Sequence, residues 1–179
     1  MKTLISIILW PIWFFYFSIT IIILFILFHI IPKNKLYVIL RPLCWSWCFI
    51  AGQWLKKKNK APSSLNQPYI YMFNHSSMFD QFMIGSYISH YITAVAAFEI
   101  FKYPIFGYII KKYGIIPIER QNIKKAISSL TLAEQSLKNG ISFLISPEGT
   151  RSETGKLLDF KKGPFHLAKN TKTTIVPIG

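Results

Sequence analysis

The segment Pro68–Asp80, PYIYMFNHSSMFD, decides how this chain is organised. Its first half, Tyr69–Phe73, is an apolar run of strand length, and its second half is polar and leads into a helix-like segment, Phe79–Ser89. In α/β sheets, ligands gather where the carboxyl end of a strand meets the loop that follows it. We therefore expect the polar residues of this loop to form part of a functional site.

Two residues of this segment have the chemistry for general-base catalysis. The imidazole is the side chain type whose unperturbed pKa lies nearest neutrality, so His75 can take a proton from a hydroxyl group and return it. A carboxylate on the other ring nitrogen, for which Asp80 is the candidate, fixes the tautomer and stabilises the imidazolium. Along one continuous helix the two side chains would point roughly 140° apart, so His75 has to lie in the turn before the helix. Ser77 as the N-cap residue would produce that arrangement and place Asp80 at the third helical position.

A purely structural interpretation of the same residues competes with catalysis. Ser77 to Asp80 fits the S/T-x-x-D/E capping pattern, in which the acid only satisfies backbone amides at the start of a helix. His75 would then be an ordinary hydrogen-bonded histidine at the end of a strand. These residues by themselves do not decide between the two interpretations.

The N-terminal part of the chain predicts a membrane anchor. The chain has 179 residues, which allow one domain and an appendage. Leu4–Ile31 is a nearly unbroken apolar run without Asp, Glu, Lys or Arg. As a helix it would be about 42 Å long, enough to cross a hydrocarbon core of about 30 Å with tilt. A cleaved signal peptide is the alternative, but its apolar region should be shorter and end at a small-residue cleavage site.

Basic residues set the orientation of this anchor. Lys2 precedes the apolar run, whereas Lys33, Lys35 and Arg41 follow it, so the positive-inside tendency places the remainder in the cytoplasm. The next apolar segment, Leu36–Leu55, is interrupted by polar residues and contains three tryptophans, which favours an interfacial helix over a second span.

The charge of the chain points to an anionic lipid surface. The formal net charge is +14, which also raises nucleic acid as a partner, but no RNP, KH or helix-turn-helix pattern is present. The lysine-rich run 56–60 follows the apolar segments, as is typical of attraction to anionic headgroups, although a solvated linker is the alternative. Cys44 and Cys48 have no nearby metal-ligand partners in the sequence, so we interpret them as packing residues and expect no metal site.

The composition changes at a turn-rich segment, residues 61–68. We therefore divide the chain into an N-terminal anchor with a basic linker, residues 1–60, and a globular domain, residues 61–179. Strand and helix patterns alternate along this domain, which predicts an α/β fold with a mixed or mostly parallel sheet flanked by helices. The strands are expected at Tyr69–Phe73, Thr93–Ala97, Ile115–Ile118, Ile141–Ile145 and Thr174–Ile178, and the helices at Phe79–Ser89, at Ile105–Tyr113, from the cap Asn122 to Lys138, and at Phe165–Lys169.

A second polar motif, PEGTRS at residues 147–152, follows the expected strand Ile141–Ile145. Its proline suits the second position of a turn and its glycine the fourth. Gly149 would let the backbone approach a ligand, Arg151 offers a planar fork for a phosphate, and Glu148 can orient Arg151. An ordinary surface turn with an Arg–Glu pair is the competing interpretation.

Several polar residues follow strands in this scheme and should share one edge of the sheet. The carboxyl ends of parallel strands meet at that edge. We therefore expect five residues to lie close together on one rim of the sheet: His75, Asp80, Arg120, Glu148 and Arg151.

Four motifs come in a fixed order along the chain: NHSSMFD at 74–80, GIIPIER at 114–120, PEGTRS at 147–152 and IVPI at 175–178. This ordered series resembles the four motif blocks of the glycerolipid acyltransferase family, most closely the bacterial 1-acyl-sn-glycerol-3-phosphate (lysophosphatidic acid) acyltransferases. The resemblance runs from about Tyr69 to the last residue. The sequence departs from the family pattern at Glu119, where Asp is common, and at Ser146, where Phe is common.

The resemblance implies an enzyme of phospholipid biosynthesis. His75 would be the general base for the acceptor's free hydroxyl and Asp80 its orienting partner. The acyl chain would pass directly from acyl-CoA or acyl carrier protein to 1-acyl-sn-glycerol-3-phosphate, giving phosphatidic acid without a cofactor. The residues that would hold the acceptor's phosphate are Arg120, Glu148, Gly149, Thr150 and Arg151.

The resemblance also implies a location at a bacterial inner membrane, with the catalytic domain facing the cytoplasm. Relatives continue beyond the fourth motif, so we expect the domain to be incomplete at its C-terminus. Other acceptors, glycerol-3-phosphate or another lysophospholipid, stay open, as does a non-catalytic lipid-binding scaffold. A hydrolase that uses a serine and His75 is a further alternative, against which no Gly-x-Ser-x-Gly elbow is present. The oligomeric state is left open.

Overall fold

The computed structural model describes residues 2–59, 62 and 66–179. The expected boundary at residues 60–61 and much of the turn-rich segment 61–68 lie outside the described residues. The chain forms two compact units, one of Met1–Ser63 with Met78–His90 and the other of Ser64–Ser77 with Tyr91–Gly179. The segment Met78–His90 therefore returns to the unit of the N-terminal helices, a feature that a single division after residue 60 did not include.

The first unit contains three helices: α1 (Lys2–Ile30), α2 (Tyr37–Ile50) and α3 (Asp80–Tyr87). Within α1, the stretch Ile5–Ile30 is long and apolar enough to cross a membrane, and no other described helix meets that criterion. The helix expected from the apolar run Leu4–Ile31 is thus present with nearly the same bounds.

Two buried indole groups join α1 to α2. Trp13 Nε1 donates a hydrogen bond to the Trp47 carbonyl at 2.8 Å, and Trp47 Nε1 donates to Thr20 Oγ1 at 2.9 Å. A buried indole N–H needs an acceptor, and each of these has one. Trp47 therefore packs inside the unit, and the interfacial location of this segment stays a prediction.

Helix α2 also packs on α3. Arg41 Nε donates a hydrogen bond to the Ser86 carbonyl at 3.1 Å. A Cβ added to Gly85 would lie 3.2 Å from Cys44 Sγ, so the absence of a side chain at residue 85 permits this close approach. Cys44 and Cys48 are both free and buried, which agrees with their interpretation as packing residues.

The start of α3 differs from the expected one. The helix begins at Asp80, and its N-cap residue is Phe79, which makes no side-chain capping hydrogen bond. Ser77 is therefore not the N-cap residue, and this part of the capping prediction is wrong. Asp80 stands at the first helical position instead of the third, where its negative charge is favourable beside the amide dipoles of the helix start.

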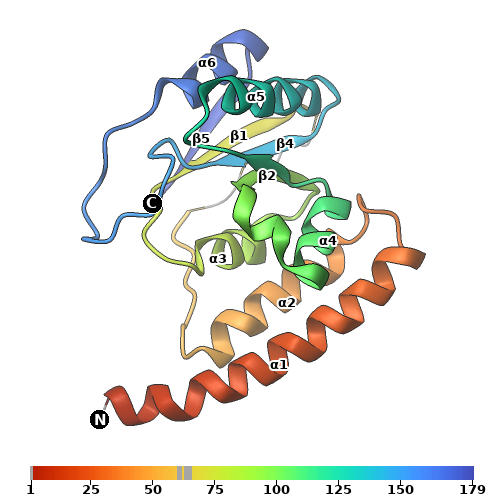
Figure 1. Cartoon of the computed structure of the whole chain (residues 1–179), viewed down its shortest axis with the longest axis vertical. Helices are drawn as coiled ribbons and strands as arrows, with labels where there is room; N and C mark the ends of the chain where they lie inside the picture. The colour runs from red at the N-terminus through yellow and green to blue at the C-terminus, as the bar shows by residue number, and fades with distance from the viewer. Residues whose placement is uncertain (1, 60–61, 63–65) are drawn as a thin grey trace. The chain divides into compact units, whose positions relative to one another are not determined.

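The second unit is built on a five-stranded sheet in the order β3-β2-β4-β1-β5 (Figure 1). All neighbouring strands are parallel, as the predicted α/β class requires. The central strands are mostly apolar on both faces, the pattern typical of a parallel sheet. The strands are β1 (Tyr69–Phe73), β2 (Ile92–Ala97), β3 (Ile116–Ile118), β4 (Ser142–Ile145) and β5 (Thr174–Ile178).

The helices of this unit have recognisable ends. Helix α4 (Pro104–Tyr113) starts on a proline and stops at Gly114, whose φ of 107° is left-handed. Helix α5 (Ile123–Lys138) is capped by the predicted residue, because Asn122 Oδ1 accepts a hydrogen bond from the Lys125 N–H at 3.1 Å. The remaining elements are the 3₁₀ helix η1 (Phe98–Lys102) and α6 (Lys162–Thr171).

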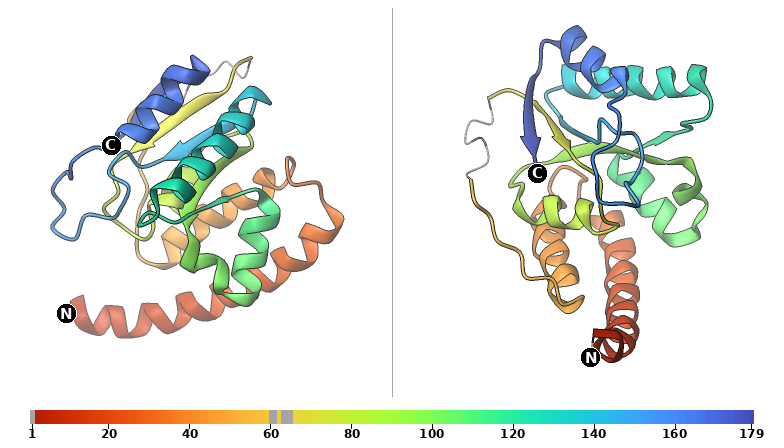
Figure 2. Two further views of the ribbon diagram at one scale, coloured as in Figure 1. Left: turned by 45° about the horizontal axis from the view of Figure 1, so that its top comes forward. Right: turned by 90° about the vertical axis from the view of Figure 1, so that its left-hand side faces the viewer.

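Helices α5 and α6 lie side by side on one face of the sheet (Figure 2). They close a core in which side chains from four strands meet small and branched residues of the two helices. This cluster consists of Ile70, Met72, Ile116, Phe143 and Ile145 from the strands and Ala133, Leu137, Leu167 and Ala168 from the helices, with Val95 and Leu130 packed against it. The core fixes the carboxyl edge of the sheet from which the candidate site is built.

Candidate active site

His75 and Glu148 occupy equivalent places in the loops that follow two neighbouring strands. The register pairs Met72 of β1 with Ile145 of β4, and His75 and Glu148 each lie three residues further on. Because the strands are parallel, both residues emerge at the same edge of the sheet, as the sequence predicted. The His75 ring is half-buried and contacts Phe73 edge-on, with ring centroids 5.5 Å apart.

The carboxylate of Glu148 is buried and holds two loops. Its side chain is only 2% exposed. Oε1 accepts a hydrogen bond from the backbone N–H of His75 at 2.9 Å, and Oε2 accepts one from the backbone N–H of Leu158 at 3.0 Å. Hydrogen bonds to a charged acceptor are stronger than those between neutral groups, and they offset the cost of burying the carboxylate. Glu148 therefore positions the backbone of the candidate base.

Further backbone hydrogen bonds bind these loops together. Ser152 N donates to the His75 carbonyl at 2.8 Å, and Lys161 N donates to the Pro147 carbonyl at 2.7 Å. Gly149 N donates to the Ser146 carbonyl at 3.2 Å, which closes the predicted turn with the proline second and the glycine fourth. Gly149 has a φ of 73°, a conformation that favours glycine.

The sequence assigned Glu148 to the acceptor's phosphate or to Arg151. The contacts favour a different task, because both carboxylate oxygens are occupied by backbone N–H groups. Arg151 and Thr150 are exposed at the end of this turn, so their side chains stand where a ligand in solution can reach them. The phosphate-binding roles of Gly149, Thr150 and Arg151 stay predictions.

Arg120 has an acidic neighbour that sequence reasoning missed. The register pairs Ala97 of β2 with Ile118 of β3, so Glu99 and Arg120 both lie two residues beyond paired positions. Partial burial lowers the pKa of the Arg120 guanidinium, and the Glu99 carboxylate acts in the opposite direction. The signal in the sequence was an acid two residues after a predicted strand, at the edge where the other candidates were sought.

Glu119, next to Arg120 in the chain, has another partner. Its carboxylate accepts hydrogen bonds from Lys125 Nζ at 2.7 and 2.8 Å, so it anchors the first turn of α5. Glu119, noted in the sequence as a departure from the motif, thus has an identified structural contact.

The strand order separates the two arginines. Arg151 follows β4, the neighbour of β1, whereas Arg120 follows β3, which is three strand steps from β1. At about 4.8 Å per step, β3 and β1 are about 14 Å apart. The structure thus brings the loop of Arg151 beside His75 and places Arg120 further along the same edge.

Asp80 belongs to the first unit, where it is buried at the first position of α3. Its pairing with the imidazole of His75 stays a prediction. Among the described residues, no group of three or more His, Cys, Asp or Glu side chains is placed to hold a metal ion.

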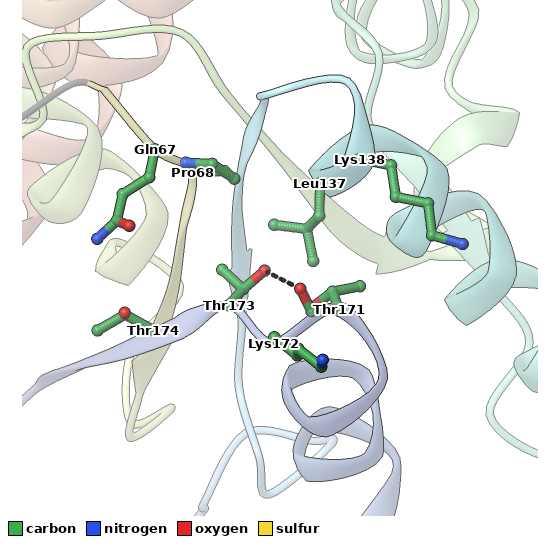
Figure 3. A pocket seen from close by; sticks show the side chains of 8 residues that line it. All are labelled: Gln67, Pro68, Leu137, Lys138, Thr171, Lys172, Thr173 and Thr174. Atoms are coloured by element: carbon green, nitrogen blue, oxygen red, sulfur yellow. Dashed lines mark hydrogen bonds between the residues drawn. The ribbon is translucent and has the colours of Figure 1, made fainter.

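A pocket of about 250 Å³ lies at the other ends of the strands (Figure 3). Pro68 directly precedes β1 and Thr174 begins β5, so the pocket borders the amino ends of these strands, whereas His75 follows a carboxyl end. Its two lysines, Lys138 and Lys172, stand at the C-terminal ends of α5 and α6, where positive charge offsets the helix dipoles. We therefore assign this pocket no part in the chemistry at His75.

The arrangement around His75 suits proton transfer to and from a bound hydroxyl. The imidazole stands on a backbone fixed from both sides, by Glu148 at its N–H and by Ser152 at its carbonyl. A fixed base beside a loop with an exposed guanidinium can orient a phosphorylated alcohol for transfer of its hydroxyl proton.

Comparison with known proteins gives one consistent result. A family model described as Acyltransferase matches residues 55–179. The 1-acyl-sn-glycerol-3-phosphate acyltransferase of Cocos nucifera is 42% identical over 110 residues, which are 61% of this chain and 36% of that protein. The 1-acyl-sn-glycerol-3-phosphate acyltransferase of Saccharomyces cerevisiae is 36% identical over 115 residues, 63% of this chain and 38% of that protein. The chain spans about a third of the length of the curated relatives that it matches.

A solved structure has the same fold. The crystal structure of the 1-acyl-sn-glycerophosphate (LPA) acyltransferase PlsC from Thermotoga maritima superposes with a TM-score of 0.81, covering 99% of this chain and 74% of that chain, at 21% sequence identity. The long apolar N-terminal helix of this chain points to association with a membrane.

Proposed function

The chain belongs to the acyltransferase family, and from this premise we propose that it transfers a fatty acyl chain to the free hydroxyl of 1-acyl-sn-glycerol-3-phosphate, giving phosphatidic acid. Relatives from plants, yeast and animals that are named 1-acyl-sn-glycerol-3-phosphate acyltransferases support the choice of acceptor. The position of His75, whose backbone is held by a buried carboxylate at the carboxyl edge of the sheet, carries the proposal.

In the proposed reaction the His75 imidazole removes the proton from the acceptor hydroxyl. The oxygen attacks the thioester carbonyl of the donor and forms a tetrahedral intermediate. The C–S bond then breaks, the acyl group stays on the acceptor oxygen, and the imidazolium returns the proton to the departing thiolate. Asp80 would stabilise the imidazolium in this sequence, and no covalent acyl-enzyme forms.

The phosphate of the acceptor needs cationic or hydrogen-bonding groups beside this base. Arg151 and Thr150 follow β4, next to the strand of His75, and are exposed. A guanidinium binds a phosphate through two parallel hydrogen bonds, which orients the glycerol backbone as well as holding it. We propose that the 149–151 turn binds the phosphate, with Arg120 as a second cation further along the edge.

The donor and the location are also proposals. Either acyl-CoA or acyl carrier protein can supply the thioester, and no cofactor is needed for this chemistry. The basic residues after α1, Lys33, Lys35 and Arg41, support an orientation in which the catalytic part faces the cytoplasm of a bacterium, at the inner membrane.

An acceptor panel on membranes that contain the full-length protein tests the function. Labelled acyl-CoA and acyl carrier protein are each offered with 1-acyl-sn-glycerol-3-phosphate, glycerol-3-phosphate and a zwitterionic lysophospholipid. We expect label in phosphatidic acid, and we expect His75→Ala to lower the rate by about a hundredfold or more at an unchanged protein level.

The panel also separates the other candidate functions. If another acceptor is used in preference, the proposed acceptor is wrong and the proposed reaction class, acyl transfer, is kept. Release of free fatty acid through an acyl-serine adduct would indicate a hydrolase. No transfer to any acceptor by a folded full-length protein would favour a lipid-binding scaffold.

A further inference from the structure

The outer surface of η1 and α4 carries large apolar side chains in the company of lysines. Tyr103 is 63% exposed, Ile105 45% and Tyr108 40%, although each is large enough to contribute to a core. We name this surface the α4 patch; it consists of Phe98, Lys102, Tyr103, Ile105, Tyr108, Lys111 and Lys112, all exposed in the second unit.

Helix geometry separates the α4 patch from the buried face of the same helix. Ile105 and Tyr108 are three residues apart, and Lys112 follows four residues later, so their side chains share one face. Gly107, two residues after Ile105 and so across the helix from the patch, is buried, and the buried Ile109 borders the patch on one side. A Cβ at Gly107 would collide with the Phe101 carbonyl, so α4 is packed tightly against η1 at this position and the two elements hold the patch together.

The charges on the α4 patch are positive and lie over its aromatic rings. Lys102 Nζ is 5.5 Å from the centroid of the Phe98 ring, and Lys112 Nζ is 5.6 Å from the centroid of the Tyr108 ring. Lys112 also donates a hydrogen bond to the Tyr108 hydroxyl at 3.3 Å. The nearby acid, Glu99, interacts with Arg120, so the three lysines keep an excess of positive charge.

We propose that the α4 patch rests on the surface of an anionic phospholipid bilayer and gives the second unit a lipid contact of its own, in addition to α1. Tyrosines with an apolar ring and a polar tip, and lysines with apolar stems, suit the boundary between acyl chains and headgroups. Such a basic, aromatic helix face is typical of elements that lie in the plane of the interface. The bilayer is favoured over an acidic protein because the same chain carries the long apolar helix that points to a membrane.

A fluorescent label measures this contact directly in the full chain. An environment-sensitive fluorophore is attached at Tyr108→Cys, and the protein is placed in vesicles of phosphatidylcholine and phosphatidylglycerol that contain nitroxide-labelled lipid. The native thiols Cys44 and Cys48 are buried, and the unsubstituted chain carried through the same labelling gives the background. Leu132→Cys, on α5 of the same unit and 48% exposed, is the matched control. We expect blue-shifted emission and strong quenching at residue 108, and neither at residue 132.

A matched set of charge variants tests the role of the lysines. Each of the variants Lys102→Gln, Lys111→Gln and Lys112→Gln should weaken the contact in anionic vesicles. We expect the ratio of protein whose α4 patch is bound to lipid to protein whose patch is unbound to fall about fivefold. The same change at three other exposed lysines of the unit, Lys124, Lys138 and Lys169, should leave quenching at residue 108 unchanged. Added salt should weaken the contact, because charges near the surface are screened.

The outcomes decide the proposal without reference to acyl transfer, so failure of the proposed function does not affect them. Equal quenching at residues 108 and 132 would overturn it. So would a spectral change at residue 108 that appears on adding acyl carrier protein in detergent and is absent in vesicles, because the α4 patch would then be a docking surface for an acidic protein.

Discussion

The carboxylate of Glu148 accepts a hydrogen bond from the backbone N–H of His75 at 2.9 Å, across 73 residues of chain. Its other oxygen accepts from Leu158, so one buried side chain connects the loop of the candidate base to the loop after β4. The precision of the proposed site depends on this connection, since small misplacements of a catalytic group are costly.

Replacing Glu148 should therefore affect turnover more than substrate binding. In Glu148→Gln the amide oxygen can accept from only one of the two backbone N–H groups, of His75 or Leu158, and the NH2 group would face the other with a donor, so the loop would shift. We expect kcat to fall on the order of tenfold to a hundredfold with little change in the KM for either substrate. The free energy of unfolding in detergent should fall by about 1–3 kcal/mol, because a buried N–H loses its acceptor. Glu153→Gln, an exposed acid of the same loop, is the control and should change neither quantity. A raised KM with normal kcat would instead support the phosphate role first expected for Glu148.

The turn at Gly149 can be tested against a second glycine. Gly149 and Gly155 both have a φ of 73°, but a Cβ would lie 3.3 Å from Lys161 Cγ at residue 149 and would meet nothing within 4 Å at residue 155. An alanine in this conformation costs about 1–2 kcal/mol. We expect both alanine variants to lose about this much stability by chemical denaturation, and Gly149→Ala to lose more. An additional Lys161→Ala substitution in Gly149→Ala should remove the difference in stability between the two alanine variants. An unchanged difference in stability would show that the contact with Lys161 is irrelevant.

Glu99 should act on substrate affinity through Arg120. Glu99→Gln removes the carboxylate that interacts with the Arg120 guanidinium, so the cation is less well placed for an anionic acceptor. Because the pair is near the surface, we expect a rise of up to about fivefold in the KM for the phosphorylated acceptor, with kcat preserved. Glu119→Gln is a matched control, since its carboxylate binds Lys125 instead. Equal effects of the two substitutions would argue against a positioning role for Glu99.

Arg151 should contribute to affinity through the geometry of its guanidinium as well as its charge. We expect Arg151→Ala to raise the KM for 1-acyl-sn-glycerol-3-phosphate about tenfold or more, and Arg151→Lys to restore only part of it, because lysine cannot form the planar pair of hydrogen bonds. A monoacylglycerol acceptor, which lacks the phosphate, should be used equally by all three proteins. Lys156→Ala, in the same loop, controls for loss of a nearby positive charge. An Arg151→Ala enzyme with unchanged KM would remove this residue from the phosphate site.

Much of the fold followed from local sequence. The bounds of β1 and β5 are those predicted, because each is an apolar run that begins after a polar or turn-forming residue. Helix α5 has the predicted cap and end, since Asn122 supplies a local hydrogen bond. Helix α6 is longer than predicted: it begins at Lys162, because Pro164 is tolerated in the first turn, where its missing N–H would have no helical partner.

By itself the sequence determined the α/β class, the apolar N-terminal helix and the polar motifs at strand ends, because these depend on periodicity, hydrophobicity and turn chemistry within short segments. Only the tertiary structure decided the strand order and the distance of Arg120 from the strand of His75. It also assigned Glu148 to the backbone of His75 and set Glu99 beside Arg120. The physical reason is that these relationships are contacts between residues remote in sequence, and a side chain's partners are fixed only when the sheet brings its strands into register.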